Sequence, residues 1–274
     1  MQNLKIALIQ TVLEWEASEK NRGHFSHRIA TIEEAVDLIV LPEMFSTGFT
    51  MNPAAVAEPM EGPTMGWMHG VAEEKSCVVT GSLVIEAGGC FYNRLIWMRP
   101  GGQYQFYDKR HLFSFAGENQ KYTTGGQKLI AELKGWKIMP MICYDLRFPV
   151  WSRNRYEEGR GFDYDVVMYV ANWPAVRSHV WRVLLMARAI ENMSYVVGVN
   201  RIGSDELGID YSGDSAVIDP RGENLSQMLP GADQTEVITL TRCPLDSLRD
   251  KFRAWADWDA FTIPPDPTLP ADFQ

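Results

Sequence analysis

Two hydrophobic patterns follow one another along most of the chain. Apolar or alternating runs of about four to eight residues predict strands, and longer stretches of mixed polarity between them predict helices. Strands are expected at residues 4–11, 37–42, 77–84, 91–98, 137–143, 164–171, 195–199, 215–219 and 236–240. Helices are expected at residues 16–36, 63–75, 149–158, 174–193 and 245–255. This repeated alternation of strand and helix predicts a layered α/β fold.

The length and apolar content of the chain fit a single domain. The chain has 274 residues, of which 46% are hydrophobic, and this is enough for one large core. Its sequence contains no internal repeat and no low-complexity linker. We therefore expect one domain over residues 1–274, with a Pro-rich C-terminal extension from about residue 256.

The charge of the chain argues against a nucleic-acid partner. The sequence has 26 Lys and Arg against 35 Asp and Glu, a formal net charge of -9, without a long basic run. Its first residues lead directly into a predicted strand, without the apolar stretch of a signal peptide or the roughly 20 apolar residues of a membrane span. We expect a cytoplasmic protein with no membrane partner.

The cysteines and histidines show no metal-binding pattern. The four cysteines form no CxxC pair, and the five histidines form no HExxH pair. We expect reduced thiols and no metal.

Three reactive side chains each follow a predicted strand. Glu43 comes directly after an apolar run, Lys109 ends a short aromatic strand, and Cys143 ends a strand just before a turn at Pro149. Open α/β sheets bind their ligands at the carboxyl ends of strands. Each side chain alone has an ordinary explanation, since cysteines at strand ends are usually buried and Glu and Lys are usually solvated. The combination of an acid, an amine and a thiol is what indicates catalysis.

The stretches around these residues resemble the nitrilase superfamily, the carbon-nitrogen hydrolases, whose signature is a Glu-Lys-Cys triad in this order. The matching stretches are residues 41–45, 107–113, 143–149, 170–174, 187–192 and 213–216. Within the superfamily they are most similar to the bacterial omega-amidases, which hydrolyse the side-chain amide of 2-oxoglutaramate. The resemblance thus implies an enzyme that takes a small-molecule amide as its substrate.

The resemblance also implies a fold and a set of roles. The fold is an α-β-β-α sandwich that pairs through a helical face into a homodimer or higher homo-oligomer. Cys143 is the expected nucleophile, Glu43 the general base and acid, Lys109 the group that stabilises the oxyanion, and Glu118 the residue that orients its neighbours. The backbone N–H of Tyr144 is expected to help hold the oxyanion. Catalysis through a thioester requires no cofactor, so we expect none.

Five further side chains are candidates for binding the substrate. Phe115, Asn172 and Trp173 fall on loops predicted to surround the strand ends, and His111 and Arg147 are the cations nearest in sequence for an acidic substrate. Some of these residues also have a structural explanation. Asn172 is also a candidate cap for the following helix, and Trp173 a core residue.

Arg147 has an alternative of its own. Buried arginines are normally paired, so an internal salt bridge with Asp145 or Glu191 competes with substrate binding.

Two other functions compete with the omega-amidase. A nitrilase or an N-carbamoyl amino-acid amidohydrolase would use the same triad on a different group. A non-catalytic binding or scaffold protein is disfavoured, because such a protein has no reason to keep all three triad residues.

Overall fold

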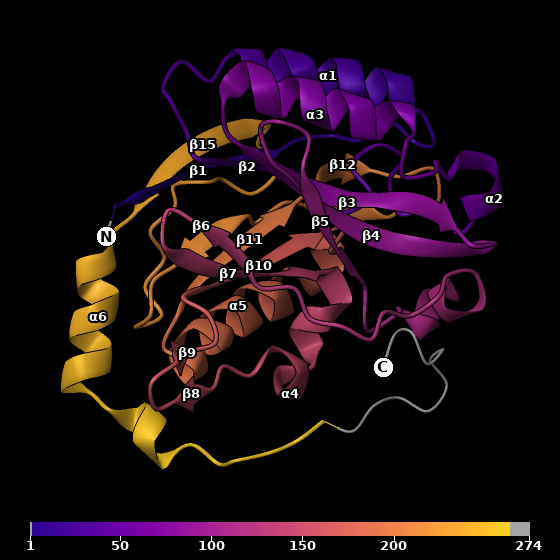
Figure 1. Ribbon diagram of the computed structural model, residues 1–274. Helices are drawn as coiled ribbons and strands as arrows, with labels where there is room; N and C mark the ends of the chain where they lie inside the picture. Colours follow the sequence, from indigo (N-terminus) through magenta and orange to yellow (C-terminus); the bar gives the residue numbers. More distant parts are fainter. Residues whose placement is uncertain (1, 264–274) are drawn as a thin grey trace.

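The computed structural model describes residues 2–263, which form two large β-sheets with helices on their outer faces and two small two-stranded sheets (Figure 1). The strands are β1 (Leu4–Gln10), β2 (Leu38–Val40), β3 (Val78–Ala87), β4 (Cys90–Met98), β5 (Tyr104–Asp108), β6 (Ala131–Leu133), β7 (Trp136–Ile142), β8 (Tyr156–Glu157), β9 (Gly161–Phe162), β10 (Val166–Ala171), β11 (Tyr195–Asn200), β12 (Ile202–Ser204), β13 (Asp210–Ser212), β14 (Ala216–Ile218) and β15 (Gln234–Leu240). The α-helices are α1 (Ser18–Ala30), α2 (Pro53–Val56), α3 (Pro63–Lys75), α4 (Pro149–Ser152), α5 (Ser178–Asn192) and α6 (Arg242–Lys251). The 3-10 helices are η1 (Ser114–Ala116), η2 (Glu118–Gln120), η3 (Cys143–Arg147), η4 (Ala175–Arg177) and η5 (Ala254–Asp257).

The two large sheets differ in size but share a parallel centre. The first has the strand order β15-β1-β2-β3-β4-β5, and the second β14-β11-β10-β7-β6. Strands β1, β2 and β3 are parallel, as are β7, β10 and β11. Strand β4 is antiparallel to both β3 and β5, so β5 runs in the same direction as β3. Within each sheet, the loops that follow these strands therefore emerge at one common edge.

The alternation of side chains along β1 explains the layering. Leu4, Ile6 and Leu8 belong to the core between the two sheets, whereas Ala7 and Ile9 belong to the core under α1 and α3. Figure 1 shows α1 and α3 covering the outer face of the first sheet, and α5 lying against the second. The layers are thus helix, sheet, sheet, helix, and the predicted α-β-β-α sandwich is confirmed.

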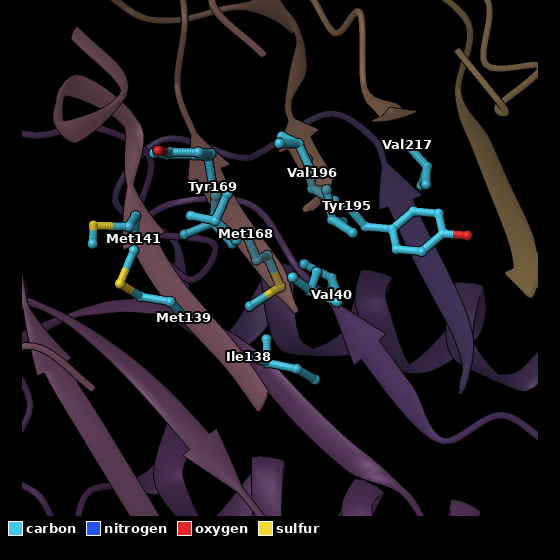
Figure 2. Close-up of a cluster of buried hydrophobic side chains, with 14 of the residues drawn as sticks. Val40, Ile138, Met139, Met141, Met168, Tyr169, Tyr195, Val196 and Val217 are labelled. Atoms are coloured by element: carbon cyan, nitrogen blue, oxygen red, sulfur yellow. The ribbon is translucent and has the colours of Figure 1, made fainter. Parts of the chain in front are cut away.

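The centre of the sandwich is built from branched and sulfur-containing side chains of both sheets. Figure 2 shows Val40 of the first sheet facing Ile138 and Met168 of the second. All three side chains are fully buried. Burying a side chain of this size contributes roughly 1.5 to 3 kcal/mol, so this interface holds the strand ends of the two sheets in fixed positions.

Helix α5 packs closely on the second sheet because β11 has a glycine beneath it. A Cβ atom at Gly198 would lie 2.6 Å from Leu185 Cδ1 and 2.8 Å from the ring of Trp181. Only a residue without a side chain leaves room for the helix at this distance.

Several predicted helices are shorter than expected. The helix predicted at residues 16–36 spans Ser18–Ala30, and the helix predicted at residues 245–255 spans Arg242–Lys251. Positive φ at Glu16 keeps that residue out of α1.

The helix predicted at residues 174–193 begins only at Ser178. The indole N–H of Trp173 donates to the carbonyl of Arg177, and the N–H of Arg177 donates to the carbonyl of Pro174, so the first turn is a 3-10 helix.

The helix predicted at residues 149–158 ends at Ser152. The N–H of Asn154 donates to the side chain of Asn192 at 2.8 Å, which takes the chain away from the helix and into the β8–β9 hairpin.

The C-terminal part is described only to residue 263. Of the predicted Pro-rich extension from about residue 256, residues 264–274 lie outside the described residues. Over residues 2–263, no helix is both long enough and apolar enough for a membrane span.

Candidate active site

The structure brings the predicted acid, amine and thiol to one edge of the sandwich. Glu43 follows β2, Lys109 follows β5, and Cys143 follows β7. Lys109 Nζ lies 2.8 Å from Glu43 Oε1, and Lys109 and Cys143 line the same cavity. Asn172, which follows β10, links the group: its N–H donates to Glu43 Oε2 at 2.8 Å, and its carbonyl lies 3.9 Å from Cys143 Sγ.

Glu118 completes a buried charge network around Lys109. Its two carboxylate oxygens lie 3.0 and 2.9 Å from Lys109 Nζ, and its Oε2 also accepts a hydrogen bond from the N–H of Phe113. Glu43 and Glu118 are fully buried, and Lys109 is 1% exposed. The network therefore contains two carboxylates and one ammonium, all shielded from water.

The electrostatics of the network hold a proton on Lys109. Burial alone lowers the pKa of the Lys109 ammonium, but the charges of Glu118 and Glu43 outweigh this effect and raise the pKa above its ordinary value. Lys109 therefore carries a positive charge at rest. Burial raises the pKa of Glu118, and the charge of Lys109 only partly offsets this rise.

An asparagine on β4 orients both carboxylates. Asn93 Nδ2 donates to Glu43 Oε1 at 2.8 Å and to Glu118 Oε1 at 3.2 Å. Its own Oδ1 accepts a hydrogen bond from the Ser82 hydroxyl, which in turn accepts one from the N–H of Met44. Glu43 Oε1 thus receives two donors, and Oε2 accepts the Asn172 N–H and has a second lone pair. A side-chain hydrogen bond also links Glu43 with the Cys143 thiol.

Cys143 stands on a corner between β7 and η3. Its φ of +41° is rare for a residue with a side chain, and such backbone strain is typical of nucleophiles on strand-to-helix turns. The residue is 9% exposed. Burial, followed by the charge of Glu43, raises the pKa of the thiol well above its ordinary value, and Lys109 lowers it by less. The resting group is therefore a neutral thiol.

The other cysteines lie in different surroundings. Burial raises the pKa of the Cys77 thiol to about 12, and the charges that act on it are those of Lys75 and Asp37. Cys90 and Cys243 are exposed. The setting of Cys143 between Glu43 and Lys109 therefore distinguishes it from the other three thiols.

A buried aspartate fixes the corner that carries Cys143. Asp145 accepts four hydrogen bonds: from the Tyr107 hydroxyl at 2.8 Å, from the N–H and ring Nδ1 of His111 at 3.0 and 2.8 Å, and from the N–H of Ile142 at 3.1 Å. Because an ionised carboxylate only accepts, the Nδ1 atom of His111 carries a proton.

Replacing Asp145 by asparagine is expected to lower both stability and activity. The amide NH2 group would face donors that now meet a carboxylate oxygen, which costs about 1 to 3 kcal/mol in the free energy of unfolding. The loss of a fixed corner should reduce kcat by at least about 10-fold. Thermal unfolding and amide hydrolysis measure the two effects. Asp246→Asn, at a carboxylate 43% exposed, is the matched control, and equal behaviour of the two variants would contradict this role.

The turn that carries Lys109 is braced by a glycine. The N–H of Gly125 donates to the carbonyl of Lys109 at 2.9 Å, and a Cβ atom at Gly125 would lie 2.1 Å from the carbonyl oxygen of Asp108.

Gly125→Ala is therefore expected to displace Lys109 and to reduce activity by about 10-fold or more. Gly70→Ala is the control, because Gly70 lies in α3 and a Cβ atom there would have open space around it, so alanine should stabilise the helix by about 1 kcal/mol. Activity assays and thermal unfolding of both variants check the prediction. Full activity of Gly125→Ala would show that the turn does not position Lys109.

A cavity of about 380 Å³ opens over the thiol. Its volume lies in the range of small-molecule sites. The lining residues are Phe49, Met51, Lys109, Phe113, Phe115, Ala116, Cys143, Tyr144, Arg147, Asn172, Trp173, Pro174, Val176, Arg177, Asp205, Leu207, Ile209 and Tyr211. Four of the five predicted pocket residues, Phe115, Arg147, Asn172 and Trp173, are among them. Tyr144 also borders the cavity and lies in the first turn of η3, where N–H groups have no partner within the helix.

His111 is the predicted pocket residue that the structure does not bring into the cavity lining. Its ring donates to Asp145 and stacks on Phe148 at a centroid distance of 3.9 Å. His111 therefore packs beside the turn that carries Cys143 and supports that turn through Asp145.

The alternatives for the other pocket residues have different outcomes. The side chain of Asn172 donates to the carbonyl of Glu43, and Arg177 is the N-cap of α5, so the capping alternative is wrong. Trp173 is 3% exposed and borders the cavity, so it is part of the hydrophobic core and also part of the cavity wall. Between residues 2 and 263, Arg147 forms no salt bridge, and the predicted pairing with Asp145 or Glu191 is wrong.

A family model described as carbon-nitrogen hydrolase matches residues 5–250. The chain belongs to the carbon-nitrogen hydrolase family. The predicted assignment to this family of amide-hydrolysing enzymes is thereby confirmed.

Similar carbon-nitrogen hydrolases include proteins with named activities. The omega-amidase YafV of Escherichia coli K12 is 44% identical over 265 residues, which cover 96% of this chain and all of the relative. The 2-oxoglutaramate amidase of Bacillus subtilis is 33% identical over 70% of this chain and 73% of the relative. The crystal structure of XC1258 from Xanthomonas campestris, a CN-hydrolase superfamily protein, has a TM-score of 0.94 and 39% identity, and the match covers 96% of this chain and all of that one.

Three features of this hydrolase site were not predicted from the sequence. Asn93 carried one signal, a polar residue beside Arg94 in a mostly apolar strand. Arg177 and the β12–β13 hairpin with Tyr211 carried no signal, because nothing in the local pattern indicates which distant loops border the cavity.

Proposed function

We propose that this chain is an omega-amidase, which hydrolyses the terminal amide of 2-oxoglutaramate and similar small omega-amides to the acid and ammonia. The observation that carries the proposal is the 44% identity to omega-amidase YafV over the whole length of that relative. The 2-oxoglutaramate amidase of Bacillus subtilis supports the same substrate. The volume of the cavity and the position of the thiol beside it suit a small linear amide.

The first half of the proposed reaction forms a thioester on Cys143. Glu43 Oε2, which keeps a free lone pair, takes the thiol proton as sulfur attacks the amide carbonyl. The ammonium of Lys109 and the N–H of Tyr144 stabilise the oxyanion, and each well-placed donor contributes roughly 3 to 4 kcal/mol. Protonated Glu43 then gives its proton to the leaving nitrogen, the carbon–nitrogen bond breaks, and ammonia departs.

The second half returns the enzyme to its resting state. Glu43 takes a proton from water, which attacks the thioester carbonyl. The carbon–sulfur bond then breaks, and protonated Glu43 returns that proton to the thiolate of Cys143. Glu118 acts indirectly: its bidentate contact with Lys109 keeps the ammonium aligned between the carboxylates.

A panel assay tests the substrate. Ammonia release is measured from 2-oxoglutaramate, glutamine, an aliphatic nitrile and an N-carbamoyl amino acid, for the wild-type protein beside Cys143→Ala. The proposal expects turnover of 2-oxoglutaramate above the other compounds and none by the variant. Preferred turnover of the nitrile or the carbamoyl compound would replace the omega-amidase assignment.

The proposed assembly is a cytoplasmic homodimer that pairs through α5. Val183, Met186 and Ile190 lie on one face of this helix and are 47%, 43% and 51% exposed. Exposed apolar side chains at this spacing are typical of a surface that another subunit covers. Sedimentation velocity tests the proposal, and a monomer at micromolar concentration would contradict it.

A further inference from the structure

The side chain of Asn200, the last residue of β11, holds both backbone groups of Trp173. Asn200 Oδ1 accepts the N–H of Trp173 at 2.8 Å, and Asn200 Nδ2 donates to the carbonyl of Trp173 at 3.0 Å. The same Nδ2 atom donates to the carbonyl of Gly213 at 2.8 Å, and Oδ1 also accepts the N–H of Arg201 at 3.0 Å. Asn200 is 1% exposed, so every donor and acceptor of its amide is used within the protein.

The backbone just after β10 is held by side chains. The pairing of β10 with β11 ends at residue 171, so residues 172 and 173 lie beyond it. The N–H of Asn172 donates to Glu43 Oε2 at 2.8 Å, and its carbonyl lies 3.9 Å from Cys143 Sγ. The N–H and carbonyl of Trp173 bind Asn200. One short segment therefore connects the asparagine on β11 with the acid and the thiol of the site.

The peptide unit between Asn172 and Trp173 transmits the hold of Asn200 to the thiol. This peptide is trans, and in a planar trans peptide the C=O and N–H groups point in opposite directions. Asn200 accepts the N–H on one side, so the carbonyl is aimed to the other side, where Cys143 Sγ lies. The indole ring of Trp173 is anchored separately, since its N–H donates to the carbonyl of Arg177 at 2.8 Å. Loss of the Asn200 amide would release the peptide and leave the ring in place.

We propose that Asn200 is a positioning residue for amide hydrolysis, which aligns the backbone of residues 172–173 so that it orients the Cys143 thiol and the Glu43 carboxylate. This inference rests on the proposed amidase function. Over residues 2–263, the cavity lining does not include Asn200, so this residue acts through the backbone and not by touching the substrate. Its loss should lower kcat by about 10-fold or more and change KM by less than about 3-fold.

A second asparagine makes the same set of hydrogen bonds at the opposite end of β10. Asn154 Oδ1 accepts the N–H of Tyr164 at 3.2 Å, and Asn154 Nδ2 donates to the carbonyl of Tyr164 at 3.0 Å. Its amide also binds the N–H of Arg155 and the carbonyl of Asn192, both at 3.1 Å. Asn154 is as buried as Asn200, but Tyr164 precedes β10, whose six residues span about 20 Å. Asn154→Ala therefore loses equivalent hydrogen bonds far from the thiol.

The test compares Asn200→Ala and Asn154→Ala with the wild-type protein. Steady-state kinetics use 2-oxoglutaramate, thermal unfolding measures stability, and peptide masses follow the rate at which iodoacetamide alkylates Cys143. We expect similar falls in the unfolding midpoint of both variants, but falls of about 10-fold or more in kcat and in the alkylation rate only in Asn200→Ala. If an alanine variant does not fold, Asn200→Ser and Asn154→Ser, which keep a hydroxyl at each position, provide the same comparison with a milder change.

Three results would overturn the positioning role and leave the amidase function standing. They are equal losses of kcat in the two variants, a wild-type alkylation rate in Asn200→Ala, and a rise in KM of Asn200→Ala with kcat unchanged. If the wild-type protein does not hydrolyse 2-oxoglutaramate, the proposed function is overturned, and the alkylation rates alone decide the role of Asn200. A slower rate only in Asn200→Ala would then support the role, and equal rates in the two variants would overturn it.

Discussion

Replacing Lys109 by methionine is expected to lower amide hydrolysis by at least about 1,000-fold, because the variant loses the positive charge that stabilises the oxyanion. The same change removes the counter-charge of Glu43 and Glu118, both fully buried. Breaking a buried ion pair by deleting one partner costs about 3 to 5 kcal/mol in the free energy of unfolding. Lys109→Met should therefore be both inactive and markedly less stable.

The loss of stability in Lys109→Met should depend on pH. Burial already raises the pKa of Glu118 in the folded wild-type protein, and removing Lys109 takes away the main effect that opposes this rise. A carboxyl whose pKa is raised by folding binds its proton more tightly in the folded state than in the unfolded state. The stability of the variant is thus greatest below the ordinary pKa of glutamate and falls as pH rises through the folded-state value.

Denaturant unfolding of Lys109→Met at acidic and neutral pH measures this effect. Lys121→Met, at an exposed lysine near the site, is the control and should match the wild-type protein at both pH values. A Lys109→Met variant as stable as Lys121→Met at neutral pH would contradict the buried charge network.

Replacing Glu43 by glutamine is expected to reduce kcat by about 100- to 10,000-fold, the range attributed to general acid–base catalysis. The thiol of Cys143 is neutral at rest because burial and the nearby carboxylate raise its pKa. Without a base, its proton has no acceptor during attack. Lys109, Asn93 and the Asn172 N–H all donate hydrogen bonds to the Glu43 carboxylate. In the glutamine variant, the NH2 group would face at least one of these donors, so a hydrogen bond would be lost.

Steady-state kinetics of Glu43→Gln and Glu118→Gln separate a base from an orienting residue. Glu118→Gln keeps the base and should lose less activity than Glu43→Gln. Glu61→Gln, at an exposed carboxylate, should be unaffected. Activity of Glu43→Gln within about 10-fold of the wild-type protein would exclude Glu43 as the general base.

The strand ends that carry the site were predictable because they depend on local pattern. Apolar runs located β2 and β7 and, with them, the carboxyl ends of two buried strands. These ends carry Glu43 and Cys143, and the end of the aromatic strand β5 carries Lys109. The combination of the three residues and the resemblance to a family then singled them out. The two-sheet sandwich was not derivable in this way, because alternating strands and helices also fit a doubly wound sheet, and only the resemblance to a family distinguished the two.

The contacts of the pocket residues were not predictable, because they depend on partners distant in sequence. For Arg147, a salt bridge with Asp145 or Glu191 was the alternative to substrate binding, but Asp145 is held by Tyr107 and His111, and the ring of Trp173 supports Arg147. Likewise, Asn93 binds Glu43 across 50 positions of sequence, a separation over which composition and periodicity carry no information.

The mass of the protein during turnover tests most directly whether Cys143 is the nucleophile. Wild-type protein is quenched with acid while it hydrolyses 2-oxoglutaramate, and intact-protein and peptide masses are measured beside Cys143→Ala. We expect an adduct equal to the substrate minus ammonia on the peptide that contains Cys143, and no adduct or turnover in the variant. An adduct on Cys77, Cys90 or Cys243, or ammonia release by Cys143→Ala, would contradict the proposed mechanism.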